Sequence, residues 1–162
     1  MRHIAGAEIL ALGEKPGHVT EASVIVDAPP AKVYQLATDY GRWPELLSDV
    51  RSVKVDGGHR DATVRFRSTA LGHEVAVKFD NVENQVIQFD SVDAPPGARA
   101  SGTYVLEPLD GGTRTRLTAT LYLDVGGVVG LLVTDRSLRA MRQAKLRADL
   151  EDVEARFTHG DG

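Results

Sequence analysis

The sequence contains no cysteine. A disulfide framework, a thiol nucleophile and a cysteine-ligated zinc site are therefore excluded. No stretch approaches the roughly 18 consecutive apolar residues that a transmembrane helix requires, so we expect no integral membrane association. The short apolar patch around residues 5–12 is followed at once by charged residues and makes a poor signal peptide. We therefore expect a cytoplasmic protein.

The excess of negative over positive charge is also small. The 162 residues carry a formal net charge of −4. This small charge gives no general attraction to nucleic acid, so we expect no nucleic-acid partner. The composition, with 42% hydrophobic and 26% charged residues, is ordinary for a globular protein. This length favours one domain with a sizeable core, and no feature of the sequence identifies a protein partner.

The sequence also lacks the motifs of the common metal, cofactor and nucleophile sites. The five histidines lie near the termini or at predicted turns, without the spacing of metal ligands. The glycine-rich segment 125–130 fails as a dinucleotide-binding loop, because that motif would need glycine where Val125 stands. We interpret the segment as the connection that lets the chain swing from the last strand onto the last helix. We expect no metal, no cofactor and no catalytic residue.

What the sequence does contain is a series of runs with a period of two. In each run, apolar residues alternate with polar ones, which predicts strands that are covered on one face and wet on the other. The turn residues at 56–58 and 110–112 favour tight hairpins. The predicted strands cover residues 19–28, 50–55, 63–71, 74–80, 86–92, 101–109 and 113–125. For the strand at 101–109, the pattern leaves open which face points inward.

Three segments predict helices. Pro29 and Pro30 open the first, which runs to Thr38, and residues 43–47 form a short second one. Residues 134–157 form a helix about 36 Å long, which matches the last strand at roughly 40 Å. We therefore predict an α+β fold in which a curved antiparallel sheet of about six or seven strands wraps around the C-terminal helix.

The predicted domain covers residues 18–159. Residues 1–17 are interpreted as an N-terminal extension. Two alternatives stay open for this extension: it docks through Ile9, Leu10 and Leu12, or it is disordered.

A line of charged residues interrupts the apolar face of the last helix. Arg142, Lys145 and Asp149 point the same general way as the apolar stripes beside them. Burying an unpaired charge costs several kcal/mol, so this side must be wet, paired or ligand-bound. One interpretation is a solvated face with ion pairs. The other is the polar side of a cavity, where Arg142 and Lys145 would hold a carbonyl, phenolate, carboxylate or phosphate group.

Hydroxyl groups also fall among the predicted inward residues. Each one alone is typical of a core hydroxyl that bonds the backbone. Together, they suit the few polar groups that orient a ligand in an apolar pocket. These hydroxyl residues are Ser68, Ser91 and Tyr104.

Two motifs resemble those of the START-like helix-grip superfamily. They are the alanine-proline helix start at residues 26–34 and the segment 39–45, which contains Trp43 and Pro44. Within the superfamily, the chain looks like the group of polyketide cyclase/dehydrase and coenzyme Q-binding proteins. The resemblance implies a hydrophobic cavity between the sheet and the last helix. Members bind lipids, sterols, quinones, polyketides or plant hormones, and some catalyse ring closure and dehydration of a bound polyketide.

The leading hypothesis is a protein that binds, and in one version transports, a hydrophobic small molecule such as a lipid, quinone or polyketide. The alternative is an aromatase/cyclase-like enzyme that uses Arg142, Lys145 and Tyr104. A third hypothesis is an accessory protein that presents a lipid or quinone to a partner. In cyclases, the resemblance implies cavity arginines, whereas Arg65 and Arg67 alternate outward. The candidate ligand-binding residues are Trp43, Leu47, Phe66, Ser68, Val77, Phe79, Phe89, Tyr104, Leu121, Met141, Arg142, Lys145 and Asp149.

Overall fold

A computed structural model describes residues 11–16, 18–47, 50–68, 73–92, 99–124 and 135–159. Within these ranges, eight strands form one sheet in the order β1-β2-β8-β7-β6-β5-β4-β3, and every neighbouring pair is antiparallel. The strands are β1 Ala11–Lys15, β2 Val19–Val26, β3 Val50–Asp56, β4 Thr63–Ser68, β5 His73–Phe79, β6 Val86–Ser91, β7 Arg99–Leu109 and β8 Arg114–Asp124.

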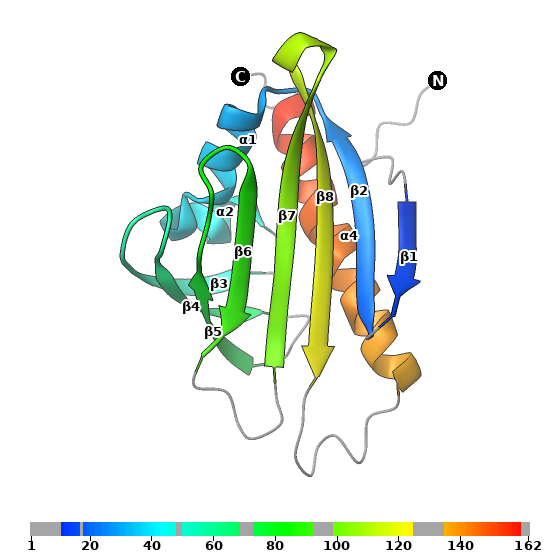
Figure 1. The fold of residues 1–162 in the computed structure, drawn as a ribbon. Helices are drawn as coiled ribbons and strands as arrows, with labels where there is room; N and C mark the ends of the chain where they lie inside the picture. Colours follow the sequence, from blue (N-terminus) through cyan, green and yellow to red (C-terminus); the bar gives the residue numbers. More distant parts are fainter. Residues whose placement is uncertain are drawn as a thin grey trace.

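Helices cover one face of this sheet. The long helix α4 crosses it diagonally, beginning near the start of β2 beside β1 and packing on β2 and β8 (Figure 1). The strands β3, β4 and β5 turn away from β7 and β8, so the sheet is curved (Figure 1). The helical segments are α1 Pro30–Ala37, the 3-10 turn η1 Tyr40–Arg42, α2 Trp43–Leu46, the 3-10 turn η2 Asp110–Gly112 and α4 Asp135–His159.

The strand β8 organises the core. Its residues alternate strictly between buried and partly exposed, because successive side chains of a strand point to opposite faces. The buried set includes Leu117, Ala119 and Leu121, and it packs in one cluster with the fully buried Leu146 and Leu150 of α4. The apolar faces of the sheet and of α4 therefore meet in a single core.

The strand β7 resolves the alternative that the sequence left open. Tyr104 lies opposite Ala119 of β8, which belongs to the buried core, and Leu106 is buried as well. Val105 is 44% exposed on the outer face. The inward side of β7 is therefore the one that carries Tyr104 and Leu106.

The predicted α+β helix-grip fold is confirmed, with its antiparallel sheet, two short helices after an early strand and a long C-terminal helix. The sheet of the described residues has eight strands, whereas about six or seven were predicted. The additional strand is β1, which lies inside the predicted extension and pairs with β2. Leu12 packs against the core, whereas Ile9 and Leu10 lie outside the described residues, as does the glycine-rich segment 125–130. The division of the chain at residues 17 and 18 stays a prediction.

Candidate functional site

A cavity lies between the inner face of the sheet and α4. Every strand from β3 to β8 contributes at least one side chain to its wall, and so do α1, α2 and α4. The apolar and aromatic lining consists of Leu36, Ala37, Trp43, Leu46, Leu47, Val50, Phe66, Val77, Phe79, Ile87, Phe89, Leu117 and Val153. The polar lining consists of Tyr104, Lys145, Asp149 and Asp152.

The volume of this cavity is about 100 Å³. Pockets that enclose a drug-sized ligand usually measure roughly 300–1,000 Å³. In this conformation, the cavity therefore holds a small molecule or one end of a larger one. A longer ligand requires the wall to move apart.

Aromatic rings form a continuous row along the cavity. Trp43 of α2 meets Phe66 edge to face at a centroid distance of 5.4 Å and Phe79 at 5.9 Å. Phe79 lies 5.9 Å from Phe89, and Phe89 lies 6.5 Å from Tyr104. Offset and edge-to-face contacts of this kind add packing energy beyond the buried area. The row joins α2 to four successive strands of the sheet, β4 to β7.

A glycine makes room for one of these rings. Gly102 of β7 pairs with Phe89 of β6, and a Cβ atom at Gly102 would lie 2.9 Å from the Phe89 ring and 2.5 Å from the Thr120 carbonyl oxygen. Both distances are too short for a side chain. Glycine is therefore required here for the Phe89 ring to lie across β7.

The polar side of the cavity is built from α4 and β7. Lys145 and Asp149 are one helical turn apart, so they share a face, and the Lys145 ammonium lies 3.4 Å from both Asp149 carboxylate oxygens. The Tyr104 hydroxyl donates to Asp149 Oδ2 across 3.4 Å. The Lys145 ammonium also lies 5.9 Å from the centre of the Phe66 ring, which is within cation–π range. Both helix side chains are nearly buried.

The Tyr104 hydroxyl is a permanent donor. Burial raises its pKa well above the ordinary value, and the negative charge of Asp149 and the hydrogen bond to it raise it further. The phenol therefore stays neutral at every ordinary pH, and its proton is directed at Asp149. A ligand oxygen that takes the place of the Asp149 carboxylate beside Tyr104 would accept the hydrogen bond from the same hydroxyl.

The structure brings nine of the thirteen predicted site residues to the cavity wall. These nine are Trp43, Leu47, Phe66, Val77, Phe79, Phe89, Tyr104, Lys145 and Asp149. Leu121 is buried in the core, Met141 lies elsewhere on α4, and neither lines the cavity. The side chain of Ser68 lies outside the described residues. Ser91 accepts a hydrogen bond from the Ala100 backbone amide, so its hydroxyl has a structural partner.

Arg142 is held away from the cavity. It is 2% exposed, its Nε donates to Thr20 Oγ1 across 2.9 Å, and its guanidinium forms an ion pair with Glu14. The Thr20 hydroxyl in turn donates to the other oxygen of Glu14. This closed ring of contacts joins α4 to β2 and β1, and we call it the edge clamp. The structure therefore separates Arg142 from Lys145 and Asp149, which the sequence had grouped together.

The charge of Glu14 is stabilised by the edge clamp. Partial burial by itself would raise the pKa of this carboxyl group. The hydrogen bonds from Thr20 and Arg142, together with the positive charge of Arg142, outweigh burial and leave the pKa below its ordinary value. Glu14 is therefore ionised in the folded protein at neutral pH.

Several lining residues were missed by the sequence reasoning. Leu117 and Ile87 lie in register with the predicted residues Leu121 and Phe89, so their periodicity was available as a signal. Leu36 is an apolar residue of the predicted first helix. Asp152 lies one turn beyond Asp149 on α4, so helical spacing was available as its signal. The remaining missed residues are Ala37, Leu46, Val50 and Val153.

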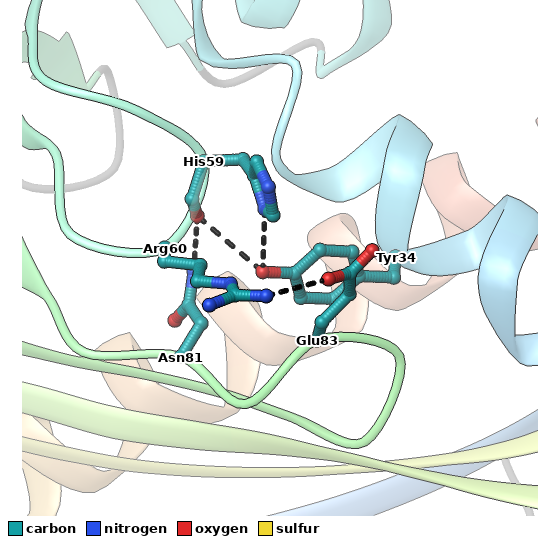
Figure 2. Close-up of polar contacts among 5 residues, drawn as sticks. All are labelled: Tyr34, His59, Arg60, Asn81 and Glu83. Atoms are coloured by element: carbon teal, nitrogen blue, oxygen red, sulfur yellow. Dashed lines mark hydrogen bonds and ion pairs between the residues drawn. The ribbon is translucent and has the colours of Figure 1, made fainter.

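A second polar cluster contributes no residue to the cavity lining but contacts it where Tyr40 meets Phe79. Figure 2 shows Tyr34 of α1 pointing at His59, whose Nδ1 lies 3.0 Å from the tyrosine hydroxyl, and Asn81 donating to the His59 carbonyl oxygen across 2.7 Å. Tyr40 donates to the same carbonyl oxygen across 2.7 Å, and its ring lies 4.7 Å from that of Phe79. Arg60 and Glu83 close the cluster with an ion pair on its exposed side (Figure 2). The sequence had treated His59 only as a turn residue.

The described residues contain no group of three or more histidine, aspartate or glutamate side chains that could hold a metal ion. No helix in the described ranges is long and apolar enough to cross a membrane.

A curved antiparallel sheet that grips a long helix, with an apolar cavity between them, defines the helix-grip class of proteins. A sequence model of the family described as polyketide cyclase / dehydrase and lipid transport matches residues 17–158. The chain belongs to this family, and the resemblance to the START-like helix-grip superfamily is confirmed. A search of curated proteins by sequence found no match.

Solved structures share the fold. A protein from Thermus thermophilus is 24% identical, with a TM-score of 0.73 over 89% of this chain and 99% of that one. A START superfamily protein from Mycobacterium smegmatis is 15% identical, with a TM-score of 0.72 over 88% and 99% of the two chains. The Zhui aromatase/cyclase from a Streptomyces species is 22% identical, with a TM-score of 0.64 over 85% and 94%.

Proposed function

We propose that this protein binds a hydrophobic small molecule, such as a lipid, quinone or polyketide, in the cavity between the sheet and α4. The observation that carries this proposal is the composition of the wall, which is apolar and aromatic apart from one polar side. Ligand pockets commonly combine such a lining with a few polar groups that fix orientation. The family match supports hydrophobic ligand binding or polyketide cyclisation at the level of the family.

The binding proposal is tested with the natural fluorescence of Trp43. This residue is the single tryptophan of the chain, and it lines the cavity. We expect saturable changes in its emission when a panel of fatty alcohols, fatty acids and short-tailed quinones is titrated. Native mass spectrometry of protein purified from its own host would then weigh any ligand that co-purifies.

A matched pair of valine substitutions serves as the control. Val153→Phe fills part of the cavity and should weaken binding at least about tenfold, or about 1.4 kcal/mol. Val105→Phe adds the same bulk on the outer face of β7 and should leave binding unchanged. Equal affinities of the two variants, or the lack of any saturable response in the unmodified protein, would contradict binding in this cavity.

An aromatase/cyclase-like enzyme is the second candidate. The supporting observation is that Tyr104, Asp149 and Lys145 meet on one side of the cavity. A phenol that stays protonated suits donation to a ketone oxygen, and a carboxylate suits acceptance of a proton from the carbon chain. Arg142, which the sequence had added to this set, is engaged in the edge clamp. We expect Tyr104→Phe to slow the cyclisation of a linear poly-β-ketone at least about tenfold while its binding persists; equal product profiles with and without the protein would exclude this candidate.

A further inference from the structure

Two hydrogen-bond donors of the cavity wall, Lys145 and Tyr104, are arranged around the carboxylate of Asp149. Asp149 accepts hydrogen bonds from both Lys145 and Tyr104, and only 6% of Asp149 is exposed. The positive charge of Lys145 is therefore offset by a negative charge fixed within hydrogen-bond distance of it. This local neutralisation decides which ligand head group can be placed against Lys145.

An ionised acid meets a penalty at this position. Its carboxylate would approach the Lys145 ammonium from beside the Asp149 carboxylate, and the two like charges would repel each other in a poorly solvated site. The acid would also lose its own hydration shell when it enters the apolar cavity. The attraction of Lys145 alone therefore does not select an anion.

A neutral oxygen meets no such penalty. A ketone oxygen can accept a hydrogen bond from Lys145 or Tyr104, and an alcohol can in addition donate to Asp149. We propose that Lys145, Asp149 and Tyr104 make this cavity selective for neutral lipophiles that carry one hydroxyl or ketone oxygen, and selective against free acids. Asp149 is the specificity-determining residue. The inference rests on the proposed function, because it concerns the same cavity.

The experiment uses three probes with chains of equal length: 1-octanol, 2-octanone and octanoic acid. Their dissociation constants are measured by Trp43 fluorescence and by calorimetry at neutral pH, where the acid is ionised. A chain of eight carbons requires less movement of the cavity wall than a long-chain lipid would. We expect the unmodified protein to bind the alcohol or the ketone at least about tenfold more tightly than the acid.

The variants show whether the charges cause this preference. Asp149→Asn removes the fixed negative charge at nearly constant volume and should shift the preference toward the acid at least about tenfold. Lys145→Gln removes the attraction and should shift it the other way. The two variants are independent tests, so the outcome of one holds even if the other fails to fold. Asp110→Asn makes the same change of charge at the exposed turn η2 and should shift nothing.

Two outcomes would overturn the inference: an acid that binds the unmodified protein as tightly as the alcohol, or a preference that stays constant in both cavity variants. Either outcome would leave hydrophobic binding itself intact. If none of the three probes changes Trp43 fluorescence or releases heat, the proposed function fails, and the inference fails with it.

Discussion

Replacing Phe79 with alanine should lower the free energy of unfolding by about 3–5 kcal/mol. The Phe79 ring is 3% exposed and stands in the middle of the aromatic row. Its centroid lies 4.7 Å from Tyr40 and 5.9 Å from both Trp43 and Phe89. Removing the ring takes away its own burial, leaves a void and withdraws contacts from three neighbours. Chemical denaturation followed by circular dichroism measures the loss.

The control for Phe79→Ala is Val105→Ala on the outer face of β7. Val105 is 44% exposed, so its truncation should cost about 0.5 kcal/mol or less. A loss below about 1 kcal/mol for Phe79→Ala would contradict the assignment of the inner face of β5. Phe79 also lines the cavity, so the variant should alter ligand affinity even where it remains folded.

Replacing Glu14 with alanine should cost roughly 2–4 kcal/mol, although the residue lies on an edge strand. The reason is Arg142, which is buried and would lose the carboxylate of its ion pair while its bond to Thr20 remains. A buried charge that loses its counter-ion is far more costly than a broken surface pair. We place the value below that of a fully enclosed pair, because 26% of the Glu14 side chain reaches water.

The neighbouring ion pair of Lys15 and Glu21 gives the control for the edge clamp. Both of its side chains are more exposed than those of the clamp, so Glu21→Ala should cost less than about 1 kcal/mol. A double variant that combines Glu14→Ala with Arg142→Leu should be more stable than Glu14→Ala alone, since it removes the orphaned charge. If Glu14→Ala and Glu21→Ala cost the same, the edge clamp does not stabilise the fold.

The edge clamp also predicts a dependence on pH. The pKa of Glu14 is lower in the folded protein than in the unfolded chain, so its contribution is fully present above the unfolded pKa. That contribution is lost as the pH falls through the lowered pKa of the folded state. The difference in stability between the unmodified protein and Glu14→Ala should therefore be largest near neutral pH and shrink in acid.

The periodicity of the sequence predicted most of the fold, because a curved sheet with one covered face imposes strict alternation on its strands. The eleven residues of β8 show this alternation throughout. The edge strand β1 escaped prediction, because it is short and its residues 13–15 are exposed. Among its described side chains, Leu12 alone packs on the core.

The candidate site was only partly predictable, and Arg142 shows why. Helical periodicity places Arg142, Lys145 and Asp149 on one face, and all three do share it. Helical periodicity cannot predict which strand faces each turn of a helix that crosses a sheet diagonally (Figure 1). At 1.5 Å per residue, Arg142 lies about 10 Å along the axis from Asp149. This distance places Arg142 against β2 and the edge strand, while Asp149 faces β7.

The position of β1 affects how fragments of this protein behave. The family match begins at residue 17, so a boundary drawn from it would discard the whole of β1 and Glu14 with it. Such a fragment would present the backbone of β2 as an open edge, ready to pair with other chains. The fragment would also leave the guanidinium of Arg142, beneath that edge, without the carboxylate of Glu14. Ligand measurements on the shortened protein would then report on aggregation as much as on the cavity, although the cavity lining includes no residue of β1.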